Sequence, residues 1–119
     1  MRLTDAEWEV LEVLWSGERF ALGEIASALH GSMGWNKNTV YTYLTRMAAK
    51  GLVDIDRSHA KPYSAAVTRD ECAHQERKKL LDRVYNGAAG DMIAAFLRET
   101  HISHDEAERL KKLLDDMEV

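Results

Sequence analysis

The fold is decided by residues 35–53, which read WNKNTVYTYLTRMAAKGLV. Asn36 or Asn38 can cap the start of a helix here, because an Asn side chain accepts a backbone N–H that the first turn leaves unpaired. Gly51 is suited to end this helix, since glycine readily adopts the left-handed conformation that follows many helices. The segment therefore predicts an amphipathic helix, and its apolar face consists of Val40, Leu44, Met47 and Ala48.

The opposite face of this segment is polar. It carries amide, hydroxyl and guanidinium groups, which can hydrogen-bond base edges or phosphates of DNA. Surface helices in general have polar faces, so plain solvation is the alternative explanation. The candidate DNA-contacting residues on this face are Asn38, Thr39, Tyr41, Thr42, Thr45 and Arg46.

Two helices are expected before this segment. Residues 3–15 read LTDAEWEVLEVLW, in which Thr and Glu have capping-box spacing and the apolar residues recur at helical spacing. This pattern predicts a helix over about 4–16. A second, shorter helix is expected over 22–30, followed by a turn over 31–34. Three tryptophans are expected to pack in the core rather than stack on bases: Trp8, Trp15 and Trp35.

Two short runs with strand-like alternation follow, over residues 52–56 and 63–67, and they are separated by a basic tip over 57–62. Three helices and such a hairpin form a winged helix-turn-helix, in which the third helix enters the major groove and the wing lies along the DNA backbone. Basic tips also protect edge strands from aggregation, which is the other explanation of this composition. The candidate backbone-contacting residues of the wing are Arg57, His59 and Lys61.

After Thr68 the pattern is helical throughout. Helices are expected over about 69–86, 88–100 and 104–118. Two of them begin with capping-box spacings, at Thr68–Glu71 and at Ser103–Glu106.

Together these elements predict a mainly α fold with a small β-hairpin wing. A winged helix-turn-helix DNA-binding domain is expected over 1–67 and a helical dimerisation domain over 68–119.

The short amphipathic helices of the second domain have too little apolar area to close a core in one molecule, so we expect a homodimer. The alternative is that they fold back on the first domain. A symmetric dimer predicts an inverted-repeat operator. The candidate dimerisation residues are Leu80, Val84, Met92, Ile93, Phe96, Leu97, Leu110, Leu113 and Leu114.

Charge is distributed unevenly along the chain. The net charge of the 119 residues is -4, but residues 30–63 hold five basic and two acidic side chains, where a DNA reader needs positive charge. No apolar run is long enough for a membrane span, and the start of the chain lacks the pattern of a secretory signal. Cys72 is the single cysteine, so no disulfide can form within the chain, and a reducing cytoplasm is the expected location.

Patterns typical of enzymes are missing from the sequence, including Gly-rich phosphate loops and nucleophile elbows. Cys72 and His74 point to different sides of a helix, and His101 and His104 have no obvious third ligand. We therefore expect neither an enzyme nor a cofactor or metal site. The competing function is a winged-helix module that binds protein without binding DNA, and the salt dependence of binding distinguishes the two.

Two stretches resemble the penicillinase-repressor (BlaI/MecI/CopY) family. They are LTDAEWEVLEVLW at residues 3–15 and TVYTYLTRMAAKG at residues 39–51, and the resemblance extends over nearly the whole chain. It implies a homodimeric repressor that sits on a promoter operator and blocks transcription until an inducer system releases it.

The resemblance also raises the hypothesis of regulated proteolysis. Family members that control β-lactam resistance are inactivated when a membrane sensor protease pathway cuts an Asn-Phe bond in their C-terminal region. An ungapped match from Tyr85 places this bond at Ala95–Phe96, where the Phe is present and the Asn is not. Phe96 is also explained as a core residue of the dimer.

The copper-responsive branch carries paired Cys-x-Cys motifs near its C-terminus, whereas residues 111–119 contain no cysteine, so copper sensing is not expected.

Overall fold

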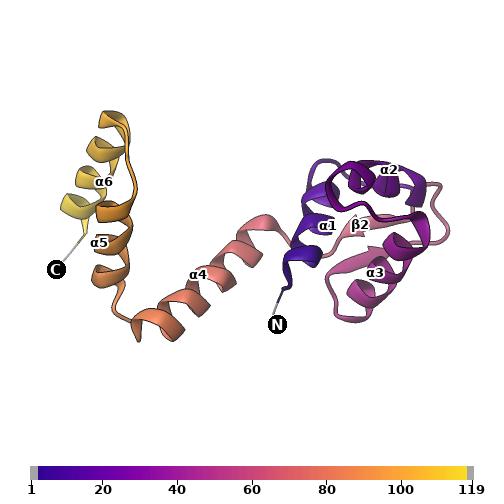
Figure 1. The fold of residues 1–119 in the computed structure, drawn as a ribbon, viewed down its shortest axis with the longest axis horizontal. Coiled ribbons are helices and arrows are strands. Elements are labelled where there is room, and N and C mark those ends of the chain that lie inside the picture. Colours follow the sequence, from indigo (N-terminus) through magenta and orange to yellow (C-terminus); the bar gives the residue numbers. More distant parts are fainter. Residues whose placement is uncertain (1–2, 118–119) are drawn as a thin grey trace. The chain divides into compact units, whose positions relative to one another are not determined.

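The computed structural model describes residues 3–117 (Figure 1). The chain divides into two compact units after His74, inside the fourth helix, whereas the boundary expected from the sequence lies after Val67. We call the described residues of these units the head (3–74) and the tail (75–117). The elements in chain order are α1 (Asp5–Trp15), α2 (Leu22–Met33), α3 (Lys37–Ala49), β1 (Val53–Ile55), β2 (Tyr63–Ala65), α4 (Arg69–Tyr85), α5 (Ala89–Glu99) and α6 (His104–Asp116).

Three helices begin at the predicted capping boxes. At Thr4–Glu7, the Glu7 N–H donates to Thr4 Oγ1 at 3.1 Å, and the Thr4 N–H donates to Glu7 Oε1 at 3.0 Å. The same reciprocal pairs occur at Thr68–Glu71 and Ser103–Glu106. Each box satisfies two backbone donors that a helix N-terminus would otherwise leave unpaired, which fixes the starts of α1, α4 and α6.

The connection between α2 and α3 is shorter than the sequence predicted. The turn expected over 31–34 is wrong in its first part, because α2 continues to Met33 and ends at Gly34. Gly34 has φ +68°, a left-handed conformation that favours glycine. Asn36 then caps α3, since its Oδ1 accepts the Thr39 N–H at 2.9 Å, and this decides between the two candidate caps.

The hairpin gains a third, strand-like segment that the sequence did not predict. Phe20, between α1 and α2, exchanges both backbone hydrogen bonds with Tyr63, at 2.8 and 3.0 Å. Backbone hydrogen bonds therefore tie β2 to the segment between α1 and α2 as well as to β1. Within the hairpin, which is shorter than the predicted runs, the antiparallel pairs are Val53 with Ala65, Asp54 with Ser64 and Ile55 with Tyr63.

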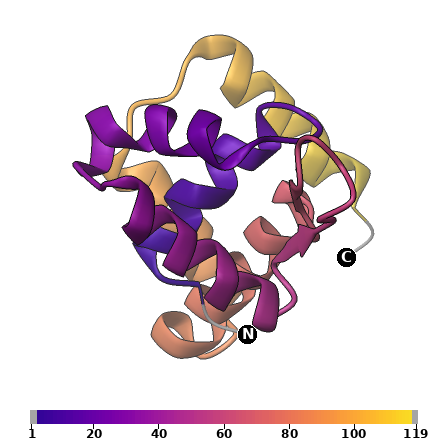
Figure 2. The same ribbon diagram turned by 90° about the vertical axis from the view of Figure 1, so that its right-hand side faces the viewer.

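The core of the head lies where α1, α2 and α3 meet the hairpin (Figures 1 and 2). Apolar side chains from all of these elements are at most 4% exposed. The predicted stripe of α3 supplies three of them, and Trp8, Trp15 and Trp35 pack against this core from its edge. The buried apolar residues are Val10, Leu11, Leu14, Ile25, Leu29, Val40, Leu44, Met47, Leu52, Val53, Tyr63 and Cys72.

The first turns of α4 belong to the head. Both Arg69 Nη atoms bind the Glu12 carboxylate of α1, one of them at 2.6 Å, and the guanidinium lies 4.9 Å from the centre of the Trp15 ring. Trp15 Nε1 donates to the Val67 carbonyl at 2.9 Å. With the Cys72 side chain buried as well, these contacts explain why the head extends to His74.

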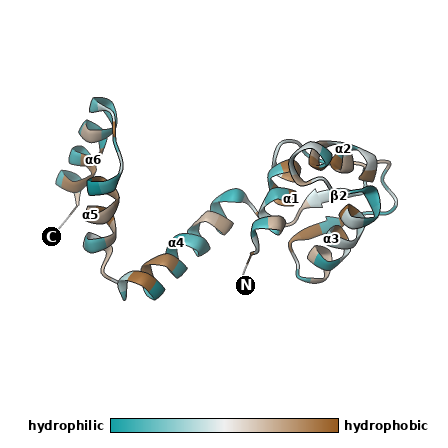
Figure 3. Cartoon of the chain, viewed as in Figure 1, coloured by the Kyte–Doolittle hydropathy of each residue, from teal (hydrophilic) through white to brown (hydrophobic). Residues whose placement is uncertain are grey.

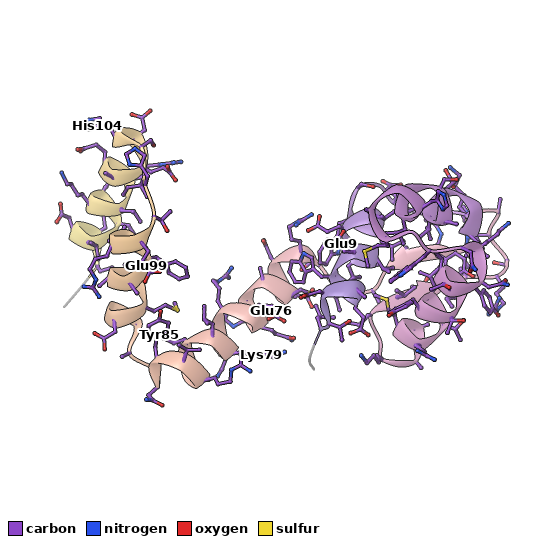
Figure 4. The ribbon with its side chains drawn as sticks, viewed as in Figure 1. Glu9, Glu76, Lys79, Tyr85, Glu99 and His104 are labelled. Carbon is purple, nitrogen blue, oxygen red and sulfur yellow. The ribbon has the colours of Figure 1, made fainter. Side chains whose placement is uncertain are left out.

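The described part of the tail contains no buried side chain. The chain reverses direction between α5 and α6, and apolar residues recur along both helices and along the second half of α4 (Figures 1 and 3). Charged residues of α4 form ion pairs along the helix. Lys79 Nζ, for example, lies 3.7 Å from Glu76 Oε1 (both residues are labelled in Figure 4). Among residues 3–117, no helix is both long and apolar enough to cross a membrane.

Candidate nucleic-acid interface

The polar residues predicted on α3 share one face of that helix. All of them are exposed except Thr39, which is half-buried. Residues three and four positions apart on a helix are neighbours, so the exposed residues form one continuous stripe. Ala49 continues this stripe at its C-terminal end and was not predicted. The stripe consists of Asn38, Tyr41, Thr42, Thr45, Arg46 and Ala49.

The two central threonines of the stripe donate their hydroxyl protons to the helix itself. Thr42 Oγ1 donates to the Asn38 carbonyl at 3.0 Å, and Thr45 Oγ1 donates to the Tyr41 carbonyl at 2.9 Å. Each hydroxyl oxygen keeps a lone pair to accept a further hydrogen bond, and each methyl group is directed away from that carbonyl. The stripe can therefore offer thymine methyls an apolar contact and base amino groups an acceptor.

An ion pair between the exposed Lys50 and the buried Glu7 anchors the C-terminal end of α3 to α1. Lys50 Nζ lies 2.6 Å from Glu7 Oε2, and the Glu7 side chain is 7% exposed. Burial raises the pKa of Glu7, but the hydrogen bonds from Lys50 and the Thr4 amide, together with the Lys50 charge, outweigh it and lower the pKa below its usual value. Glu7 is therefore ionised at neutral pH and holds α3 in place.

Aromatic stacking supports the other end of α3. The rings of Trp35 and Tyr43 lie 4.3 Å apart with 13° between their planes. Both side chains are half-buried against the core, while Tyr41 on the polar stripe is 43% exposed. Tyr41 is accordingly the α3 aromatic that is accessible to a ligand.

The wing tip is ordered by its own hydrogen bonds. Asp56 Oδ1 accepts the hydroxyl and the N–H of Ser58, at 2.6 and 3.1 Å, and these bonds lower the pKa of Asp56. The Lys61 N–H donates to His59 Nδ1 at 2.9 Å, so this ring nitrogen acts as an acceptor. The tip is therefore a defined structure rather than an open loop.

The three predicted wing residues are all exposed, and they differ in their partners. Lys61 Nζ lies 3.3 Å from Glu24 Oε2 at the start of α2, with both side chains about half exposed. Arg57 has no hydrogen bond or ion pair to the rest of the described chain. Arg57 is thus the wing cation that is available to a phosphate without breaking an existing pair.

Two basic residues near this surface were missed by the sequence analysis. Lys37 is exposed in the first turn of α3, beside the polar stripe. Arg19, between α1 and α2, binds backbone carbonyls of the wing at Lys61 and Pro62. No local pattern marks Arg19, because its partners are more than forty residues away in the sequence.

The predicted dimerisation residues all lie on the helices of the tail. Leu80 and Met92 are half-buried, and the other seven are at least 37% exposed in a single chain. Leu113 and Leu114 are the most exposed, at 61% and 60%. Met117, at 55%, extends this apolar surface and was not among the predicted residues.

Ala95 and Phe96 lie inside α5, where Ala95 is half-buried and Phe96 is 52% exposed. The Phe96 carbonyl accepts the Thr100 N–H at 2.9 Å. The peptide bond between Ala95 and Phe96 is therefore in helical conformation. Within residues 3–117, no group of three or more His, Cys, Asp or Glu side chains is arranged to hold a metal ion.

Comparison with known proteins gives one family match and several relatives. The family model described as penicillinase repressor matches residues 3–116. The methicillin resistance regulatory protein MecI of Staphylococcus aureus (strain N315) is 25% identical over 114 residues, which cover 95% of this chain and 93% of that protein. The penicillinase repressor of Bacillus licheniformis is 25% identical over 116 residues, which cover 97% and 91%. A solved structure of a MarR/EmrR family transcriptional regulator from Acinetobacter sp. ADP1 aligns with a TM-score of 0.42 at 17% identity and covers 97% of this chain and 78% of that one.

Proposed function

Since this chain belongs to the penicillinase repressor family, we propose that it is a transcriptional repressor that binds an inverted-repeat operator as a homodimer. The observation that carries the proposal is the exposed polar stripe on α3. The core of the head is formed by other residues, so the stripe is not needed for packing. In this arrangement α3 is the recognition helix in the major groove, and the wing follows the phosphate backbone. Thr42 and Thr45 read base edges, and Arg46 binds a guanine or a phosphate.

Charge supports the same assignment. The segment over residues 30–63 contains α3 and the wing and has a surplus of three positive charges, although the whole chain is acidic. Phosphate neutralisation by Lys and Arg is the main source of affinity for duplex DNA. Arg46, Arg57 and Lys37 are exposed cations of this segment that can supply it, and Lys61 can do so by leaving Glu24.

The homodimer is supported by the apolar surface of the tail. Val84, Ile93, Phe96, Leu97, Leu110, Leu113, Leu114 and Met117 are each at least 37% exposed in one chain, an apolar exposure that a single soluble domain avoids. A second copy supplies the same surface, and two-fold pairing buries both at once. Two heads on one duplex then bind two half-sites, which multiplies their separate affinities.

Binding to duplexes from the chain's own upstream region tests the proposal. We expect specific binding at low salt, with a log-log salt slope of about -0.9 for each phosphate contacted. Arg46→Ala should weaken binding by roughly 5- to 150-fold, the range for one good base contact. Arg109→Ala removes the same charge from the tail and should leave affinity unchanged.

The competing function, a protein-binding winged helix, predicts a different result. Wild-type protein would then bind none of these duplexes at low ionic strength, and Arg46→Ala would behave like Arg109→Ala. Either finding would contradict the repressor assignment.

Release of the operator by proteolysis at Ala95–Phe96 is part of the proposal with a structural requirement of its own. A protease binds its substrate in extended form, so α5 must unwind locally before this bond is cut. We expect a shortened tail fragment to appear when the native host is exposed to cell-wall antibiotics. Intact protein together with induced target genes would reject this step and leave the repressor assignment standing.

A further inference from the structure

Arg19 lies between α1 and α2 and binds the returning arm of the wing through its whole guanidinium group. Nε donates to the Lys61 carbonyl at 2.8 Å, and Nη2 donates to the Pro62 carbonyl at 2.6 Å. Nη1 donates to Ser64 Oγ at 3.3 Å. The planar guanidinium thus spans the end of the tip and the start of β2, which a single-point donor such as Lys cannot do.

The neighbouring residue extends this attachment. Phe20 pairs with Tyr63 through two backbone hydrogen bonds, so residues 19 and 20 together hold three consecutive wing residues, 61–63. The Pro62 carbonyl also accepts the Asp56 N–H at 2.8 Å, which links the two arms of the tip. Movement of the wing away from the helices therefore requires breaking the Arg19 hydrogen bonds.

The charge of Arg19 is already used within the protein. Nη2 lies 3.7 Å from Asp54 Oδ2 in β1, and the Arg19 side chain is 25% exposed. Arg19 is thus poorly placed to neutralise a phosphate itself, in contrast to the exposed Arg57. Its contacts are suited to fix the position of the basic residues of the wing.

We propose that Arg19 is a positioning residue for DNA binding, because it fixes the wing at the angle from which Arg57 and Lys61 reach the phosphate backbone. The proposal rests on the function proposed above. A wing that is already held in one orientation can contact phosphates at once. A mobile wing must first be ordered, and the free-energy cost of this ordering lowers the affinity for DNA.

The test compares full-length Arg19→Ala and Arg19→Lys with wild type on the same duplex. We expect Arg19→Ala to weaken binding roughly tenfold and to make the salt slope shallower by about 0.9 for each phosphate that the wing no longer neutralises. Arg19→Lys keeps the charge but lacks the planar guanidinium group with its several donors, and it should behave like Arg19→Ala. Wild-type affinity and slope in Arg19→Lys would overturn the proposal, because charge alone would then suffice.

A double-mutant cycle separates positioning from a loss of stability. In a background that already carries Arg57→Ala and Lys61→Ala, the wing has no cation left to position, so Arg19→Ala should add little further loss. An undiminished tenfold loss in that background would show that Arg19 acts elsewhere. A merely structural role would lower the unfolding midpoint without changing the salt slope.

Hydrogen exchange of the free protein keeps the test independent of DNA binding. In Arg19→Ala the Asp56 amide should exchange several-fold faster than in wild type, while the Leu44 amide in α3 stays protected. If no duplex is bound by wild type, the proposed function fails, and this exchange result still decides whether Arg19 holds the wing. Unchanged exchange at Asp56 would overturn the proposal.

Discussion

The head and the tail begin their helices in the same way but bury their apolar residues differently. Reciprocal capping boxes start α1 in the head and α6 in the tail. In the head, twelve apolar side chains are almost completely buried. In the described part of the tail no side chain is buried, although α5 and α6 are clearly amphipathic. Good local helix signals therefore do not by themselves provide a core.

From this difference we expect the two parts to obtain their stability from different sources. The head contains three helices and a hairpin whose apolar faces meet within one molecule. The tail also has apolar faces, but no third layer covers them within its described residues. Burial of such faces is the main favourable term in folding, and in the homodimer proposed above a second copy supplies it to the tail.

The largest expected effect follows from placing a charge on the apolar face of the tail. Ile93→Glu should prevent pairing, because it puts a carboxylate into the interface, and operator affinity should fall by about 10²- to 10⁴-fold when two half-sites no longer act together. Arg98→Glu, on the opposite face of the same helix, is the matched control and should leave pairing intact. Anisotropy titrations and sedimentation velocity measure the two effects, and wild-type affinity in Ile93→Glu would contradict the role of this face.

A cavity created in the head should lower the stability of the protein whether or not two chains pair. Leu44→Ala removes a fully buried side chain and should lower the free energy of unfolding by about 2–5 kcal/mol at every protein concentration. Leu114→Ala in the tail should instead have an effect that grows with concentration, because this side chain is exposed in one chain and is buried only in the proposed dimer. Urea denaturation across a range of concentrations distinguishes them, and equal behaviour of the two variants would remove the contrast between head and tail.

The ion pair between Lys50 and the buried Glu7 predicts a pH dependence. The folded-state pKa of Glu7 is below its usual value, so the ionised side chain stabilises the head above the unfolded-state pKa, and this contribution disappears as pH falls through the folded-state pKa. Glu7→Gln should cost about 1–3 kcal/mol at neutral pH and should make stability less sensitive to acid. Chemical denaturation from neutral to acidic pH measures this, and parallel pH curves for variant and wild type would refute it.

The smallest effect is expected on the polar surface of the tail. Lys78 lies 4.0 Å from Asp82, and both side chains are more than 60% exposed. Solvent screens such pairs, so Lys78→Ala should change the free energy of unfolding by less than about 0.5 kcal/mol. Thermal denaturation checks this value, and a loss comparable to that of Leu44→Ala would contradict the exposure of this part of α4.

Much of the fold could be predicted because its signals are local. The capping boxes, the apolar stripe of α3 and the order of helices and hairpin each depend on residues a few positions apart. The exposure of the polar stripe follows from the same periodicity. The end of α2 was predicted too early, because Gly31 and Gly34 look alike in sequence and only Gly34 adopts the left-handed conformation.

The contacts that orient the α3 stripe and the wing could not be predicted in this way. Glu7 and Lys50 are far apart in sequence, as are Arg19 and Pro62, and neither pair has a local pattern. Glu7 was identified only as a capping residue, although its second carboxylate oxygen holds Lys50. Sequence periodicity indicates which face of a helix is polar, while the angle of that face depends on such long-range pairs.

Sedimentation equilibrium of the full-length protein without DNA tests the central claim most directly. We expect a mass of twice the 13.5 kDa chain at micromolar concentration, with reversible dissociation on dilution and unchanged near-ultraviolet circular dichroism of the tryptophans in the head. A single species of 13.5 kDa at every concentration would contradict it, because the apolar face of the tail would then need no second copy.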